Sequence, residues 1–193
     1  MLLFLAPLVL GFVLDTASAF TTAFSRRWGE RRGQQITFVL RNVLGIPLWV
    51  AGLGVAVRTR SPVIFSSTPV AEVLGWLLLA GGSAVQILAL FALRSRAAAP
   101  STRDTLVEHG PYAHVRHPIY AGLLLELAGL VLVRPTQAAA LACAIGLGWV
   151  LVQARCEETD LLQRLPAYRQ YMKHVPRFLP RIHARRPWGK VGR

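Results

Sequence analysis

Five apolar stretches, separated by short polar segments, dominate the pattern of this sequence. They cover approximately residues 1–24, 36–57, 70–93, 119–133 and 136–153. A helix needs about 20 residues to cross the hydrocarbon core of a bilayer, and the first three stretches meet that length. The last two are shorter, and only the three residues 134–136 separate them, which predicts a tight helical hairpin. The pattern therefore predicts an all-α protein, a polytopic transmembrane helix bundle with about five spans.

The composition agrees with a membrane location. Of the 193 residues, 53% are hydrophobic and only 16% are charged, against about 25% charged residues in soluble proteins. The length allows a single membrane domain, residues 1–193. We expect three N-terminal transmembrane helices in 1–93. The region 94–193 would hold the helical hairpin, a cytoplasmic C-terminal cap and the catalytic groups.

The positive charge follows the membrane pattern. The net charge is +13, but the basic residues lie between apolar stretches and form no single soluble face of the kind that binds nucleic acid. If the N-terminus is outside, the inside segments 25–35, 94–118 and 154–193 hold 18 of the 22 Lys and Arg residues, and the outside loops hold 3. Cytoplasmic loops carry such an excess. We therefore expect no nucleic-acid partner and an integral protein of the cell inner membrane, with its C-terminus in the cytoplasm.

The segment 106–120, LVEHGPYAHVRHPIY, concentrates candidate chemistry where the chain enters the membrane. Pro118 suits the first turn of a helix, because its missing N–H would be unpaired there. His117 would then lie at the helix start, where free backbone N–H groups favour an anionic ligand group. Arg116 would add a two-pronged donor for the same kind of group.

A second polar cluster follows the fifth apolar stretch and contains Arg155, Cys156, Glu157 and Glu158. Adjacent carboxylates at a membrane interface can bind an ammonium group or a pair of ribose hydroxyls, and the alternative is a solvated surface. Successive residues on a helix differ by about 100°, so we expect only one of the two carboxylates to face a pocket, and we choose Glu158. The histidines at 109, 114 and 117 match no strong metal signature, so we expect no metal site.

One acid lies within an apolar stretch. Glu126 shares a helix face with Gly122 and Gly129, so it is expected to point into the bundle. Two interpretations stay open: it lines an acceptor pocket, or it pairs with Arg41 or Asn42. The small residues Ala140, Ala144 and Gly148 recur every four positions, and we expect this face and that of Gly122 to pack the hairpin closely.

These motifs together resemble the isoprenylcysteine carboxyl methyltransferase and phospholipid methyltransferase superfamily of integral membrane enzymes. The resemblance covers about 106–181 and rests on the order and spacing of several pieces. They are Gly110-Pro111-Tyr112, then Arg116-His117-Pro118-Ile119-Tyr120-Ala121-Gly122, a hairpin, Glu157-Glu158, Tyr168 and Tyr171, and finally Arg177 and Pro180.

The resemblance implies S-adenosylmethionine as cofactor, a cytoplasmic pocket under the C-terminal segment, and a lipid or other lipophilic small molecule as substrate. Methyl transfer from a sulfonium needs alignment and desolvation more than acid or base groups. An isoprenylcysteine substrate is not carried over, because residues 94–100 lack a segment that many relatives place before the Gly-Pro-Tyr. The implied catalytic residues are Arg155 and Glu158. The implied cofactor-binding residues are Gly110, Pro111, Tyr112, Arg116, His117, Pro118, Tyr120, Glu157 and Glu158.

Two other functions remain open at this point. Sterol-reductase-like membrane enzymes share a related C-terminal hairpin and would use NADPH. A non-catalytic helix-bundle protein would need neither cofactor.

Overall fold

A computed structural model describes residues 3–97 and 100–180, and its regular elements are helices, which confirms the all-α prediction. The α-helices are α1 (Ala6–Ser18), α2 (Thr21–Trp28), α3 (Glu30–Phe38), α4 (Ile46–Arg58), α5 (Pro69–Leu93), α6 (Pro118–Val133), α7 (Gln137–Arg164) and α8 (Tyr168–His174). A π-helical turn, Val39–Gly45, joins α3 to α4. Three 3-10 turns complete the set: Leu3–Leu5, Arg94–Ala97 and Gly110–Ala113.

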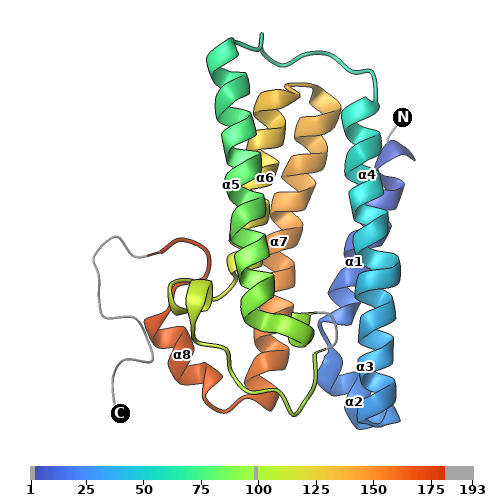
Figure 1. Cartoon of the computed structure of the whole chain (residues 1–193). Helices are drawn as coiled ribbons and strands as arrows, with labels where there is room; N and C mark the ends of the chain where they lie inside the picture. The colour runs from blue at the N-terminus through green and yellow to red at the C-terminus, as the bar shows by residue number, and fades with distance from the viewer. Residues whose placement is uncertain (1–2, 98–99, 181–193) are drawn as a thin grey trace.

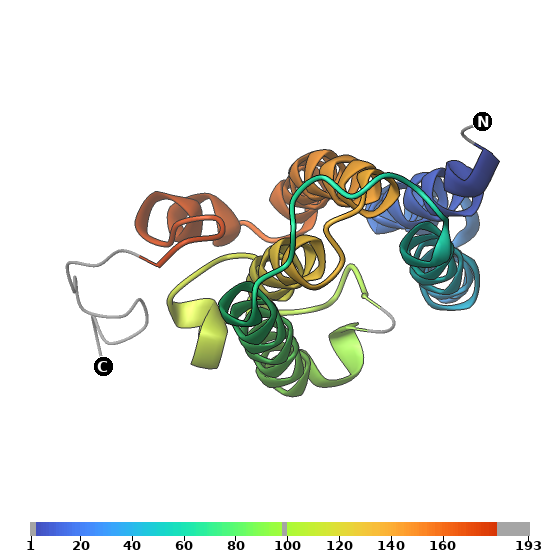
Figure 2. The same cartoon turned by 90° about the horizontal axis from the view of Figure 1, so that it is seen from above.

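The helices form two groups with α7 between them (Figures 1 and 2). One group contains α1 and the continuous rod of α3 and α4, and the other contains α5 and α6. The connection from α4 to α5 crosses one end of the bundle and touches the turn between α6 and α7. There Ile64 N donates to the Pro135 carbonyl (2.7 Å), and Gln137 N donates to the Pro62 carbonyl (2.9 Å). The opposite end carries α2, α8 and the long connection from α5 to α6 (Figure 1).

Three helical segments of the described chain are long and apolar enough to cross a membrane: Glu30–Arg58, Pro69–Leu93 and Gln137–Arg164. The number rises to four if Leu3–Ser18 and Thr21–Trp28, which are bent by 61°, form one broken span. The prediction of about five spans is therefore confirmed only in part. The first apolar stretch is not one straight helix, and α6 is an apolar helix of 16 residues, about 24 Å long at 1.5 Å per residue.

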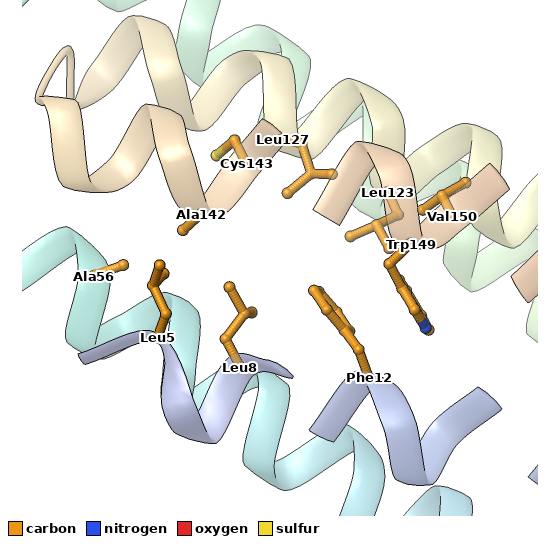
Figure 3. Close-up of a cluster of buried hydrophobic side chains, with 10 residues drawn as sticks. All are labelled: Leu5, Leu8, Phe12, Ala56, Leu123, Leu127, Ala142, Cys143, Trp149 and Val150. Carbon is orange, nitrogen blue, oxygen red and sulfur yellow. The ribbon is translucent and has the colours of Figure 1, made fainter. Parts of the chain in front are cut away.

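The largest buried cluster joins the two groups of helices (Figure 3). Phe12 of α1 stacks on Trp149 of α7, with ring centroids 4.3 Å apart. The same cluster contains Leu5, Leu8, Phe12, Ala56, Leu123, Leu127, Ala142, Cys143, Trp149 and Val150. The core thus fastens the N-terminal helices to the predicted hairpin.

The glycines of α6 pack against α5, and the prediction that they close the hairpin onto α7 is wrong. A Cβ atom on Gly122 would lie 2.5 Å from the Gly82 carbonyl oxygen, and one on Gly129 would lie 2.6 Å from that of Gly75. The two pairs repeat at seven residues along both helices, so the backbones of α5 and α6 approach closely along their length. Glu126 lies between these pairs. It accepts hydrogen bonds from Ser83 Oγ and Gln86 Nε2, both at 2.6 Å, so the predicted partners Arg41 and Asn42 are also wrong.

The buried face of α7 differs from the predicted one as well. Ala144 and Gly148 are exposed, and a Cβ on Gly148 would meet no atom of the described residues within 4 Å. The buried face instead carries Ala139, Ala142, Cys143, Gly146 and Val150. Helix α7 also continues to Arg164, eleven residues beyond the apolar stretch, because the hydrophobic pattern marks only the apolar part of the helix. The Glu pair therefore lies within this helix and not after it.

Candidate active site

The polar segments predicted to carry chemistry meet near the second half of α7, at the end of the bundle where α6 begins (Figure 1). His117 is the N-cap residue of α6, and Pro118 follows it at the first helical position, as the sequence predicted. The His117 imidazole does not cap the helix and is directed toward α7. The His117 side chain is only 5% exposed and lies between the two glutamates, 3.1 Å from Glu158 Oε1 and 3.7 Å from Glu157 Oε2.

Glu158 gathers three basic side chains around a buried carboxylate that is 5% exposed. Its Oε1 lies 3.1 Å from Arg116 Nη2, from His117 Nε2 and from Arg177 Nε. Its Oε2 accepts a further hydrogen bond from Arg177 Nη2. A buried carboxylate is tolerated when it is paired and hydrogen-bonded, and here the pairs also tie α7 to two other segments.

Glu157 faces a different set of partners and is more accessible, with 21% of its side chain exposed. Its Oε1 accepts hydrogen bonds from Tyr120 Oη (2.6 Å), Arg41 Nη2 (3.0 Å) and Gln153 Nε2 (3.5 Å). Both glutamates therefore reach the cluster, from the two sides of His117. That only one of them, Glu158, faces a ligand pocket stays a prediction.

The segment after α8 lies against the start of α6. The backbone N–H groups of Arg116 and His117 donate to the carbonyls of Pro176 (2.8 Å) and Arg177 (3.0 Å). The Arg116 guanidinium donates to the Met172 carbonyl (2.9 Å). These bonds bring Arg177 to Glu158, and the hydrogen bond to Glu158 raises the pKa of the Arg177 guanidinium above its ordinary value.

The Gly110-Pro111-Tyr112 turn contacts helix α8. Gly110 has φ +60°, a left-handed conformation that favours glycine. Tyr112 is buried, and its carbonyl accepts a hydrogen bond of 2.6 Å from Tyr171 Oη in α8. Burial raises the pKa of Tyr112, Tyr168 and Tyr171 above the ordinary value, so their hydroxyls stay protonated at neutral pH.

Three buried polar atoms at the cluster lack a hydrogen-bond partner among the described residues. They are Arg116 Nε, Gln153 Oε1 and the hydroxyl of Tyr168, whose residue is 2% exposed. Native structures leave few buried polar groups unpaired, because each costs free energy. Beside a polar cluster, such atoms are candidates for a hydrogen bond to a ligand group.

The structure brings together most residues that the sequence singled out, but not Arg155. That side chain is exposed, and its catalytic role stays a prediction. Sequence reasoning missed Arg41 and Asp15 as neighbours of the cluster. Both are charged residues inside apolar stretches, which was the available signal. In the described residues no group of three or more His, Cys, Asp or Glu is arranged to hold a metal ion.

The long apolar helices are those of an integral membrane protein, and the polar cluster defines a candidate site where α6 begins and α7 leaves its apolar part. Comparison with protein families identifies its relatives. The sequence model of the isoprenylcysteine carboxyl methyltransferase (ICMT) family matches residues 82–163, which confirms the resemblance drawn from the motifs. The matched segment runs from within α5 almost to the end of α7.

The chain is also similar to the cobalt-zinc-cadmium resistance protein CzcN of Cupriavidus metallidurans. The two are 33% identical over 82 residues, which cover 41% of this chain and 37% of that relative. No solved structure matches the chain.

Proposed function

We propose that this protein transfers a methyl group from S-adenosylmethionine to a lipophilic acceptor at the membrane surface. The observation that carries the proposal is the cluster of His117, Arg116 and the two glutamates, formed by a segment that matches the ICMT family. The acceptor would be a lipid or another small molecule with an apolar chain. The predicted topology would put this cluster on the cytoplasmic side.

The residues present fit the polar groups of S-adenosylmethionine, which carries a carboxylate, an ammonium group and two ribose hydroxyls. The unpartnered Arg116 Nε suits an acceptor such as the carboxylate, and Arg177 lies beside it on Glu158. The accessible Glu157 carboxylate suits the ammonium group or the ribose hydroxyls. The Tyr168 hydroxyl can either donate or accept. Donors and acceptors of the required kinds are therefore both present.

The cofactor, when bound, supplies an activated methyl group on a sulfonium. The chain's own residues would then have three tasks. Arg116, Glu157 and His117 bind and orient polar groups. The backbone bonds from Arg116 and His117 to residues 176–177 hold the C-terminal segment over the site, where it limits the access of water. The rigid pairing around Glu158 keeps these groups in one arrangement, which is the main requirement for a transfer that depends on alignment.

A lipophilic acceptor agrees with the position of the cluster beside apolar helices. An acyl or isoprenoid chain in the bilayer gains about 0.8 kcal/mol per buried CH₂ group, so its anchoring needs no pocket in the protein. The site then has to recognise only the polar end of such a molecule.

The direct test is equilibrium binding of S-adenosylmethionine and NADPH to the purified full-length protein in detergent. We expect S-adenosylmethionine to bind and His117→Ala to weaken its binding at least about tenfold, the effect of one lost charge-assisted hydrogen bond. His114→Ala is the matched control, because His114 is exposed three residues away, and it should bind as the wild type does. Radiolabelled methyl groups should also pass into the organic extract of native membranes.

Two results would overturn the proposal. Binding of NADPH in place of S-adenosylmethionine would assign the site to a reductase. Binding of neither by a folded protein would leave a non-catalytic helix bundle. Wild-type affinity in a folded His117→Ala variant would remove this residue from the site.

A further inference from the structure

A basic residue from the N-terminal half of the chain reaches the cluster. Arg41 lies outside the segment that matches the ICMT family, yet its Nη2 donates to Glu157 Oε1 at 3.0 Å. The contact joins positions 116 residues apart in sequence. Arg41 is 17% exposed, and its charge lies within a helix that is otherwise apolar enough to span a membrane.

The backbone around Arg41 is adapted to this contact. Arg41 lies in the π-helical turn Val39–Gly45, a rare insertion that often occurs at functional sites. Gly45, in the same turn, allows α1 to approach closely, since a Cβ there would lie 3.0 Å from the Cβ of Asp15. The turn therefore places Arg41 between α1 and α7.

Two side chains of helix α1 also contact the Arg41 guanidinium. Arg41 Nε donates to Ser18 Oγ at 3.3 Å and lies 3.7 Å from Asp15 Oδ1. Asp15 is in turn fixed by a hydrogen bond of 3.3 Å from Trp49 Nε1. A long side chain held at several points loses its rotamer freedom during folding, so it presents Nη2 to Glu157 without a further entropy cost on ligand binding.

The two carboxylate oxygens of Glu157 differ in the number of hydrogen bonds that they accept. Oε1 takes three hydrogen bonds, from Arg41, Tyr120 and Gln153. Oε2 takes none from the described residues, and its ion-pair neighbour, His117 Nδ1, is at 3.7 Å, beyond hydrogen-bond distance. Oε2 is thus the carboxylate atom left for an outside donor.

We infer that Arg41 is a positioning residue of the site: it holds Glu157 through Oε1 so that Oε2 receives a donor group of the bound cofactor, an ammonium or a hydroxyl. The inference rests on the proposed function and extends it beyond the family-matched segment. The N-terminal helices then do more than anchor the protein, because the site is incomplete without the arginine of their π-helical turn.

A double-mutant cycle in the full-length protein tests this role. We expect Arg41→Gln and Glu157→Gln each to weaken S-adenosylmethionine binding about tenfold, the effect of one charge-assisted hydrogen bond. The double variant should bind no more weakly than the weaker single variant. Arg58→Gln is the matched control, since Arg58 is exposed at the far end of α4, and it should leave the affinity unchanged. Losses that multiply in the double variant, or wild-type affinity in folded Arg41→Gln, would overturn the inference.

A ligand-free measurement separates this inference from the proposed function. In protein labelled with ¹⁵N-histidine, Arg41→Gln should move the imidazole resonances of His117, because Glu157 is released beside it. The same change should have no effect on them in a Glu157→Gln background. If the wild type binds no S-adenosylmethionine, the proposed function fails and these spectra alone decide the role of Arg41. Resonances that do not move, or that move equally in both backgrounds, would show that Arg41 does not act through Glu157.

Discussion

Two regions of the molecule hold glutamates against polar partners, and the partners differ in kind. Glu126 lies in the glycine-lined contact of α5 and α6 and accepts one hydrogen bond on each oxygen, from Ser83 and Gln86. Both donors are neutral and come from α5. Glu157 and Glu158 instead meet charged or titratable groups from α6, the π-helical turn and the segment after α8.

We interpret Glu126 as an acid that serves assembly, and we propose the two glutamates of the cluster as acids that bind a ligand. A carboxylate in an apolar setting is costly unless its oxygens are hydrogen-bonded, and each oxygen of Glu126 accepts a hydrogen bond from one neighbouring helix. The cluster around His117 is also heavily paired, yet Arg116 Nε, Gln153 Oε1 and the Tyr168 hydroxyl have no hydrogen-bond partner within the described part of the chain. The unpaired polar atoms therefore favour the second region over Glu126 as the place where a ligand binds.

The largest effect is expected from Glu158→Gln. Removing this carboxylate leaves two arginines near each other without their shared partner, and breaking a buried ion pair costs about 3–5 kcal/mol. We expect the free energy of unfolding in detergent to fall by about that amount and cofactor binding to be lost. Arg177→Gln removes the more exposed partner and should destabilise less, so it reports on binding in a folded protein. Wild-type stability of Glu158→Gln would contradict the role of this residue as the centre of the cluster.

An intermediate effect is expected from Gly82→Ala in the contact of α5 and α6. The added Cβ would lie 2.5 Å from the Gly122 carbonyl oxygen, which belongs to backbone and cannot turn aside. Overpacking of this kind costs about 1–3 kcal/mol, measurable as a lower unfolding temperature in detergent. The adjacent Gly81→Ala is the control, because its Cβ meets nothing within 4 Å, and the better helix propensity of alanine should leave it neutral or slightly stabilised. Equal effects at both positions would contradict the close approach of the two helices.

The smallest effect is expected from Glu126→Gln. An amide keeps an oxygen for Gln86 and can donate to the Ser83 hydroxyl, so the hydrogen bonds survive the loss of charge. We expect stability within about 1 kcal/mol of the wild type, and no change in cofactor affinity or in the KM for the acceptor. A changed KM at unchanged stability would make Glu126 part of the acceptor site and remove the distinction between the two regions.

The sequence alone determined the helical class, the membrane location and the pieces of the candidate site. The apolar stretches follow from the length that a bilayer requires, and the order of Gly110, His117 and the Glu pair in the sequence indicates the ICMT resemblance. His117 was placed correctly at the start of α6, because a proline fixes the first turn of a helix locally. Such features depend on neighbouring residues, so the sequence carries them directly.

Only the tertiary structure decided which helix each face meets. From their spacing alone, the glycines of α6 could pack against either α5 or α7. The arrangement of the bundle places them against α5. The partner of Arg41 is likewise decided by the tertiary structure. Glu157 is 116 positions away in sequence, so helical periodicity cannot identify it as that partner. A helical pattern fixes the direction of a side chain around its own axis, whereas its partner depends on how all the helices pack together.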